Sequence, residues 1–333
     1  MTAARPLLPP YPTGWYVISL SRDLAAGTVK PMRFMGQDVI LYRTQAGQSN
    51  VMGAYCPHLG AHMGYGGTVR GENIRCPFHS FEYNLAGACV SIPYDSRIPP
   101  KATAQVFPTQ EKNGFVLAYY DSSGSTPTWD VPELDRRDWT DLIATHWIMR
   151  GHPQETTENS VDIGHFTETH GYNSVEQLKP LTVDGPYLTT QYAMRRPTLG
   201  RNIRSEFEIH VHGLGYSQVD VEVTEMGVKA RLFVLATPIG DEQICLRLAL
   251  SAYQKIDIKQ IHPVLSLLPR RALITAIARP TFAGFKHDVE QDIPIWTHKR
   301  YVQPPILAGG DGPVGRYRTW VKQFYTEFDQ QRV

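Results

Sequence analysis

The alternation of hydrophobic and polar positions has a short period in the first third of the chain. Between residues 15 and 120, short segments rich in Val, Ile, Tyr and Phe are separated by Gly, Asp and Asn; they read GWYVISL, VKPMRFM, DVILYRT, SNVMGAY, NIRCPF, FEYN and GFVLAYY. Short apolar runs between turn residues are typical of antiparallel strands. We therefore expect a small all-β domain over residues 15–120, preceded by an N-terminal arm of residues 1–14.

The segment after Tyr120 marks a change in the pattern. It reads DSSGSTPTWDVPEL, and its Ser, Gly, Pro and Asp content is typical of a linker. A second domain is then expected over residues 121–333. Its first element is predicted to be a helix over residues 152–170, because Pro153 lies near the start and Glu155 and Glu158 follow in the first turns.

Longer alternating runs occupy the middle of this second domain. They predict strands over residues 187–195, 203–211, 218–225, 227–236 and 243–253. Helical periodicity returns over residues 261–278, 285–300 and 314–330. A meander of strands combined with helices predicts an α+β fold, in which helices pack against one antiparallel sheet.

Composition excludes several classes of protein. The 333 residues include 33 Lys and Arg against 32 Asp and Glu, and this balance argues against a nucleic-acid-binding face. No run approaches the roughly 18 apolar residues of a transmembrane segment, and prolines interrupt the first twelve residues, where a secretory signal would need an apolar helix. The four cysteines are too few for a disulfide scaffold, so a cytoplasmic location is expected.

Two Cys/His pairs form the first candidate metal site. Cys56 and His58 are followed, after seventeen intervening residues, by Cys76 and His79. Two thiolates and two imidazoles suit a tetrahedral zinc ion, and they also suit a [2Fe–2S] cluster in which two histidines bind one of the irons. Both pairs lie on loops with neighbouring Pro and Gly, between predicted strands.

The segment ENSVDIGHFTETHG, residues 158–171, is the second candidate. His165 and His170 are five residues apart, which is roughly 500° of rotation, so on a regular helix their side chains point about 140° apart. One metal ion binds both only if the helix breaks or contains a π bulge, and Gly164 and Gly171 favour such a distortion. Without further context, solvated histidines are the more common outcome.

These motifs resemble those of a known family. The pattern C-x-H-x17-C-x-x-H, followed by FEYNLAGACVSIP, resembles the Rieske domain of ring-hydroxylating oxygenases, and D-x-x-H-x4-H at residues 162–170 resembles their catalytic helix. The resemblance implies a Rieske [2Fe–2S] cluster held by both Cys/His pairs and a helix-grip-like catalytic domain. It also implies a mononuclear Fe(II) bound by His165, His170 and a distant carboxylate.

The carboxylate is expected in HDVEQDIPIWTHKRY, which is similar to the corresponding region of the family. Asp292 occupies the ligand position there, and Glu290 and Asp288 are the alternatives. Two histidines and one carboxylate leave one face of the metal open, as in Fe(II) sites that activate O₂. The resemblance further implies that Asn159 lies near the iron and that Asp162 connects an iron ligand to a cluster histidine of a neighbouring subunit.

The resemblance also implies the partners. The family forms head-to-tail homotrimers, in which each cluster serves the iron of the next subunit. The chain has no credible dinucleotide motif, since Gly213-Leu214-Gly215 lacks the third glycine of the fingerprint. Electrons are therefore expected from a separate ferredoxin or flavin reductase, so that NAD(P)H is used indirectly.

The substrate class is indicated by three further segments. GWYVISLSRDLAAGTVKPMRFMGQDVILYRT, TPTWDVPEL and IWTHKRYVQPPILAGGDGPVGRYRTWVKQFY resemble the steroid and sterol branch, which includes 3-ketosteroid 9α-hydroxylase and the cholesterol 7-desaturase group. A monooxygenase that hydroxylates, desaturates or demethylates a hydrophobic steroid-like molecule is the leading hypothesis. One alternative is the same chemistry on an aromatic ring, an alkaloid or an N- or O-methyl group. Another is a Rieske electron carrier whose second domain only binds a partner.

Overall fold

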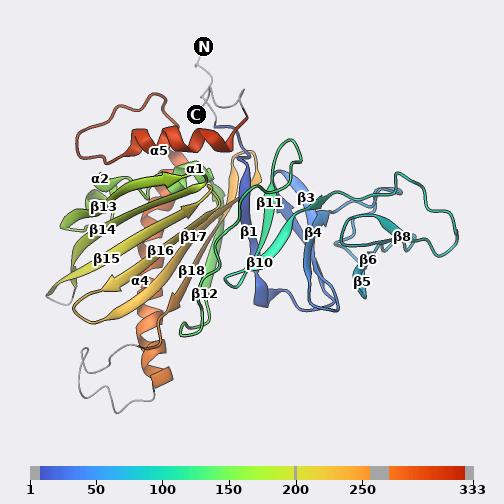
Figure 1. Ribbon diagram of the computed structural model, residues 1–333, viewed down its shortest axis with the longest axis horizontal. Helices are drawn as coiled ribbons and strands as arrows, with labels where there is room; N and C mark the ends of the chain where they lie inside the picture. The colour runs from blue at the N-terminus through green and yellow to red at the C-terminus, as the bar shows by residue number, and fades with distance from the viewer. Residues whose placement is uncertain (1–7, 199–200, 256–269, 327–333) are drawn as a thin grey trace. The chain divides into compact units, whose positions relative to one another are not determined.

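The structure, a computed structural model, describes residues 8–198, 201–255 and 270–326. These residues form two compact units. The first comprises Thr13–Glu133 and Thr237–Asp241, and the second comprises the rest of the described chain. The first consists of small antiparallel sheets, whereas one large antiparallel sheet with helices makes up the second (Figure 1). The α+β fold class that the sequence predicted is confirmed.

The first unit contains three sheets among its described residues. Their strand orders are β1-β11-β10, β2-β3-β4-β9 and β5-β6-β7-β8. In chain order the elements are β1 (Gly14–Leu20), η1 (Ser21–Asp23), β2 (Val29–Phe34), β3 (Gln37–Arg43), β4 (Ser49–Gly53), β5 (Thr68–Arg70), β6 (Asn73–Arg75), β7 (Glu82–Tyr83), β8 (Cys89–Ser91), β9 (Val106–Phe107), β10 (Thr109–Lys112) and β11 (Phe115–Tyr120). The predicted apolar segments all contribute strands here.

The second unit is built on a seven-stranded sheet in the order β12-β18-β17-β16-β15-β14-β13. Its strands are β12 (Ile143–Arg150), β13 (Ser174–Asp184), β14 (Tyr187–Thr198), β15 (Arg201–His212), β16 (Tyr216–Val223), β17 (Val228–Gly240) and β18 (Gln243–Ala252). The five strands predicted from alternation correspond to β14–β18. The strand β13 was not predicted, because most of its side chains are exposed and two register shifts interrupt its pairing.

Helices cover one face of this sheet. They are α1 (Pro153–Glu158), α2 (Ile163–Glu168), α4 (Arg270–His298) and α5 (Val314–Val321), and α5 continues into η3 (Lys322–Phe324). The helix α4 packs its apolar side chains, among them Val289 and Trp296, against Leu246 and Leu248 of β18. No described helix combines the length and the apolar character that crossing a bilayer requires.

Three helix predictions require correction. The segment 152–170 forms two short helices instead of one, with residues 159–162 between them. The helices predicted over residues 261–278 and 285–300 are parts of one continuous helix, α4, which contains Pro280 and Pro294. Residues 261–269 lie outside the described residues. The last predicted helix is shorter than residues 314–330, because Tyr325 is already extended.

A buried polar contact fixes the position of α1. Glu158 accepts hydrogen bonds from Arg318 of α5 at 2.7 and 2.9 Å, and both side chains are about nine-tenths buried. Tyr317 of α5 donates to the carbonyl of Gln154 at 2.6 Å. Because Tyr317 of α5 belongs to one apolar cluster with Leu188 and Tyr192 of β14, α5 holds α1, and with it Asn159, against the sheet.

Candidate functional site

The two Cys/His pairs lie on two tight loops of the first unit. The loop around Cys56 is closed by backbone hydrogen bonds from Cys56 to Ala61 and from Gly60 to Cys56, both 2.9 Å. The loop around Cys76 is closed by a 2.8 Å bond from its N–H to the carbonyl of Phe81. The two loops come together, because the ring centroids of His58 and His79 are 4.7 Å apart.

The four side chains differ in exposure in a way that suits a two-iron cluster. Cys56 and Cys76 are 3% and 2% exposed, whereas His58 and His79 are half-buried. The thiols therefore face the core and the imidazoles face outward. Burial raises the pKa of the Cys76 thiol, so its thiolate form requires a cationic partner such as iron.

The donor set of the Cys/His pairs suits a zinc ion as well as a cluster. Ligand atoms of one tetrahedral zinc lie roughly 3.3–3.8 Å apart, given metal–ligand distances of about 2.0–2.3 Å. Within the described part of the chain, only one group of three or more such residues has all its ligand atoms within 4.8 Å, and it contains no cysteine. Cys56, His58, Cys76 and His79 form no such group of three.

Tyr83 completes this site. Its hydroxyl lies 3.1 Å from Cys56 Sγ, and burial raises its pKa, so the phenol stays protonated and is able to donate to the sulfur. Phe81 stacks on His58 with ring centroids 4.4 Å apart. The sequence interpretation did not assign either residue a role, although both directly follow the second Cys/His pair.

The second candidate site depends on the short helix α2. Asp162 is its N-cap, with Oδ1 accepting from the N–H of His165 at 3.2 Å. The helix ends at Glu168, and Gly171 has a φ of +69°, the left-handed conformation that commonly follows a helix C-terminus. His165 therefore lies on the helix and His170 beyond its end, and a helix break, not a π bulge, brings the two imidazoles together.

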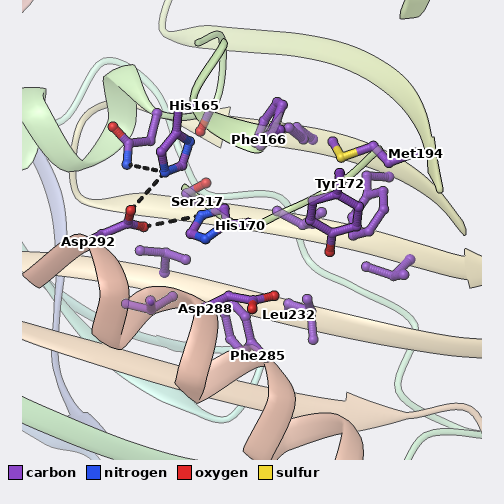
Figure 2. Close-up of a pocket in the computed structure, with 18 of the residues that line it drawn as sticks. His165, Phe166, His170, Tyr172, Met194, Ser217, Leu232, Phe285, Asp288 and Asp292 are labelled. Atoms are coloured by element: carbon purple, nitrogen blue, oxygen red, sulfur yellow. Dashed lines mark hydrogen bonds and ion pairs between the residues drawn. The ribbon is translucent and has the colours of Figure 1, made fainter. Parts of the chain in front are cut away.

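The third member of the site comes from α4. Asp292 Oδ1 lies 2.7 Å from His165 Nε2, and Asp292 Oδ2 lies 3.5 Å from His170 Nε2 (Figure 2). All three side chains are at least nine-tenths buried. Two imidazole nitrogens and a carboxylate oxygen at right angles on one metal, each about 2.1 Å from it, would lie about 3 Å apart, so the spacing fits a single ion.

The electrostatics of the triad also fit a cation. Burial opposes ionisation of Asp292, but the hydrogen bonds and charges of His165 and His170 outweigh it, so its pKa is lowered. His170 Nδ1 lies 3.1 Å from Gln291 Oε1, which is only an acceptor, so this nitrogen carries the proton. Nε2 of His170 therefore faces Asp292: it donates to the carboxylate when the ring is protonated, and it offers its lone pair to a metal ion when the ring is neutral.

The other predicted residues have distinct positions. Asn159 Nδ2 lies 3.2 Å from His165 Nε2, beside the triad. Asp288, one alternative ligand, binds Arg196 at 2.8 Å, and Glu290, the other, pairs with Lys286 at 2.9 Å on an exposed face of α4. Neither belongs to the group of three ligands.

A cavity of about 320 Å³ adjoins the triad. It lies between the inner face of the sheet and α4. Phe166, Met194, Leu232 and Phe285 are among its apolar walls (Figure 2), which also include Phe207 and Trp296. His165, His170, Asp292 and Asn159 line it as well. An apolar chamber that exposes one side of a His/His/Asp group is suited to oxidising a hydrophobic molecule.

The sequence interpretation missed three polar residues here: Gln291, Arg196 and Tyr172. Gln291 directly precedes Asp292, which was the available signal for it. Arg196 is an even number of residues from Leu188 and Tyr192 on the same strand, so its side chain lies on the same face of the sheet. Leu188 and Tyr192 mark that face as the inner one.

Known protein families match both units. The model of the Rieske [2Fe–2S] domain matches residues 14–108, and the model of the 3-ketosteroid 9α-hydroxylase C-terminal domain matches residues 118–325. Cholesterol 7-desaturase of Bombyx mori is 29% identical over 346 residues, which cover 96% of this chain and 71% of that protein. The oxygenase component of 3-ketosteroid-9-alpha-monooxygenase of Rhodococcus rhodochrous is 29% identical over 331 residues, with 95% and 82% covered.

Solved structures share the fold. NdmA of Pseudomonas putida CBB5 with caffeine superposes with a TM-score of 0.73 at 16% identity, covering 92% of this chain and 89% of that one. Dicamba monooxygenase bound to dicamba gives 0.66 at 17% identity, with 96% and 97% covered. The chain therefore belongs to the Rieske non-haem iron oxygenases, with the C-terminal domain of the 3-ketosteroid 9α-hydroxylase family, and its cofactors are a [2Fe–2S] cluster and a mononuclear iron.

Proposed function

We propose that this enzyme is the terminal oxygenase component of a Rieske-type monooxygenase that oxidises a steroid- or sterol-like substrate. In this proposal His165, His170 and Asp292 bind the mononuclear iron, and Cys56, His58, Cys76 and His79 bind the cluster. Residues 15–120 form the cluster domain and residues 121–333 the catalytic domain. The reaction is a hydroxylation, a desaturation or a demethylation.

One observation carries the proposal: the three ligand atoms within 4.8 Å of one another open onto an apolar cavity. When bound, the iron supplies the activation of O₂. The chain itself holds the metal through two neutral imidazoles and one carboxylate, fixes the tautomer of His170 through Gln291, and keeps one side of the group facing the cavity. The apolar walls exclude bulk water from the reacting face.

The substrate class is supported by the relatives and by the cavity. The two relatives compared above are named for cholesterol and for a 3-ketosteroid. Phe207, Leu232 and Phe285 are among the aromatic and aliphatic side chains that line the cavity from the sheet and from α4, as a rigid polycyclic molecule requires. The volume of about 320 Å³ lies at the lower end of the range for small-molecule sites, which favours a compact ligand.

Electrons are proposed to come from a separate ferredoxin or flavin reductase that oxidises NAD(P)H. They pass through the cluster, and in a homotrimer the cluster of one subunit serves the iron of the next. Asp162, directly N-terminal to the helix that carries His165, is proposed to connect that histidine to a cluster histidine of the neighbouring subunit. The cytoplasmic location stays a prediction.

Single turnover tests the proposed function without the native reductase. Both metal centres are reduced with dithionite, the reductant is removed, and O₂ is admitted with each member of a steroid panel. We expect a product with one added oxygen, two hydrogens fewer, or one methyl group fewer, as identified by mass spectrometry. The His165→Ala variant, which keeps the cluster, should give none. Product from the variant, or no product from any steroid with the wild type, contradicts the proposal.

A further inference from the structure

An ion pair crosses the cavity beside the metal group. Arg196 of β14 donates from Nη1 to both carboxylate oxygens of Asp288 of α4, each at 2.8 Å. The guanidinium lies over the ring of Tyr172, 5.4 Å from its centroid. All three residues line the cavity, whose other walls are mostly apolar. The Arg196 and Asp288 side chains are 34% and 16% exposed, so the pair is partly buried and interrupts an otherwise mostly apolar lining.

The pair is placed at a defined distance from the proposed iron ligand. Asp288 precedes Asp292 by four residues on α4, so the two carboxylates leave the same face of the helix about 6 Å apart along its axis. Figure 2 shows Asp288 and Tyr172 on the side of the cavity that leads away from Asp292 and His165. If one end of a polycyclic molecule contacts the pair, a carbon one or two rings away from that end would thus lie near the metal.

The charge of the cavity limits what the pair is able to bind. Among the described lining residues the full charges are Arg196, Asp288 and Asp292, apart from the two histidines of the triad. Asp288 neutralises Arg196, so the pair itself has no net charge to offer a carboxylate, and the one charge by which Fe(II) exceeds Asp292 lies at the metal group. At the pair, a neutral oxygen atom would benefit from the local N–H and carboxylate groups.

We propose that Arg196, Asp288 and Tyr172 recognise a neutral oxygen function, a hydroxyl or a carbonyl, on an otherwise apolar polycyclic substrate. Arg196 donates to the oxygen of either group, and Asp288 accepts from a hydroxyl. The site therefore selects alcohols and ketones over hydrocarbons and carboxylates. This inference rests on the proposed function for the steroid scaffold, but it assigns the specificity to residues that the metal chemistry does not use.

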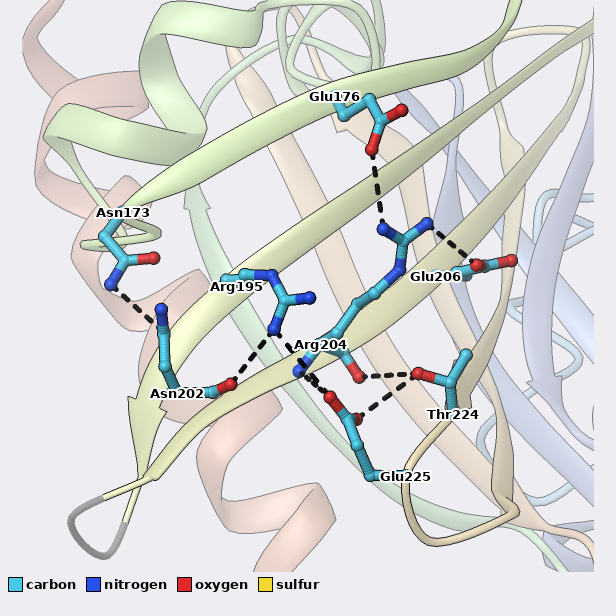
Figure 3. Close-up of polar contacts among 8 residues, drawn as sticks. All are labelled: Asn173, Glu176, Arg195, Asn202, Arg204, Glu206, Thr224 and Glu225. Carbon is cyan, nitrogen blue, oxygen red and sulfur yellow. Dashed lines mark hydrogen bonds and ion pairs between the residues drawn. The ribbon is translucent and has the colours of Figure 1, made fainter.

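The chain offers a matched control at the preceding position. Arg195 is on the same strand, but successive side chains point to opposite faces of a sheet. Figure 3 shows Arg195 on the outer face, near Asn202 and Glu225 and beside the contacts of Arg204 with Glu176 and Glu206. Arg195→Met removes a charge of the same sign from the same strand without touching the cavity.

The test compares ligand affinities in the double variant Arg196→Met/Asp288→Asn, which avoids leaving one charge unpaired. Dissociation constants for androstane, androstan-3-one, androstan-3-ol and a steroid carboxylate are measured by fluorescence, since Trp296 lines the cavity. We expect the wild type and Arg195→Met to bind the alcohol and the ketone at least tenfold more tightly than the hydrocarbon. The double variant should reduce this preference to less than twofold while keeping its affinity for androstane.

Each other result decides against the inference. The inference is overturned if the wild type binds the alcohol and the ketone no more tightly than the hydrocarbon, or if the double variant keeps that preference. It is also overturned if the steroid carboxylate binds the wild type more tightly than the alcohol does. Unchanged androstane binding and an unchanged unfolding midpoint show that the variant is folded. If the double variant fails this check, Arg196→Gln/Asp288→Asn, which also removes both charges, replaces it with the same expected loss of preference.

The outcome is separable from that of the proposed function. If no steroid binds the wild type, the steroid assignment fails, and the same comparison with tetralin, 1-tetralone and 1-tetralol decides the inference. If steroids bind with the expected preference but no product forms in single turnover, the proposed function fails and the recognition site stands. If none of these compounds binds, both are overturned.

Discussion

Asp292 Oδ1 lies 2.7 Å from His165 Nε2, although 127 residues separate the two in the chain. The contact joins α4 to α2 across one end of the cavity, on the face of the sheet that both helices cover. His170 joins from beyond the end of α2, with Nε2 3.5 Å from Asp292 Oδ2. The folded chain thus presents three ligand atoms together before any metal binds.

Removing Asp292 should remove the mononuclear iron alone. We expect Asp292→Ala to lose about one iron per chain, because two imidazoles do not hold Fe(II) tightly without the carboxylate, while the visible spectrum of the cluster is unchanged. Metal analysis with the absorption spectrum measures both. Glu290→Ala is the matched control, since Glu290 pairs with Lys286 on the exposed face of α4. Equal iron loss in the control would contradict the assignment of Asp292.

Gln291 should tune the affinity for the metal. Its Oε1 lies 3.1 Å from His170 Nδ1, and removing such a partner typically weakens metal binding 10- to 100-fold. We expect this loss in Gln291→Leu, measured by competition with a chelator. Gln291→Glu keeps an acceptor at the same position and should retain the affinity. A leucine variant with wild-type affinity would show that the contact does not orient His170.

Asp162 allows a structural role to be separated from a role in electron transfer. Asn is as good an N-cap as Asp, so Asp162→Asn should preserve α2, the iron content and the cluster spectrum. Under multiple turnover with NADH and a reductase, we expect its rate to be nearly abolished, because the link between the two metal centres needs the carboxylate. Asp162→Ala should additionally lose about 1 kcal/mol of stability. Full turnover by the asparagine variant would disprove the proposed link.

The buried His152 should make stability depend on pH. Burial lowers its pKa to about 4 from the ordinary 6.5, and its Nδ1 accepts from the N–H of Gln154, which requires the neutral ring. The unfolded chain therefore binds a proton at a higher pH than the folded chain. The stabilisation is complete above pH 6.5 and is lost as the pH falls toward 4, by on the order of 3 kcal/mol.

Urea unfolding between pH 7 and pH 4 tests this dependence. His152→Asn keeps a neutral acceptor at the N-cap of α1 and should show a flatter decline in the free energy of unfolding, even if its stability at pH 7 is lower. If the variant and the wild type decline with the same slope, His152 is not the group responsible.

The sequence predicted the fold class and the cofactors because their signals are local. The Cys/His spacing lies within 24 residues, and the strands β14–β18 contain long runs of partly alternating apolar residues. The relation between His165 and His170 could not be read in the same way. A regular helix would separate them, and the break depends on Gly171 and on the packing of Phe166, which is tertiary.

Other features could not be predicted from the sequence because they also depend on tertiary contacts. The strand β13 has an exposed pattern that alternation does not detect, and it forms because β14 provides a paired edge. The position of Asp292 was predicted from resemblance, but its neighbours Asp288 and Gln291 acquire their roles only from Arg196 of β14 and from His170 after α2. Contacts between distant elements carry no periodic signal.

The most direct test of the account is the product of the reaction. Purified protein with both metal centres reduced is mixed with ¹⁸O₂ and a keto- or hydroxysteroid, and the products are analysed by mass spectrometry alongside His165→Ala. We predict a steroid that has gained one labelled oxygen, lost two hydrogens or lost a methyl group, formed by the wild type alone. Product formed equally by His165→Ala, or unchanged steroid throughout, would contradict oxidation at the His165–His170–Asp292 site.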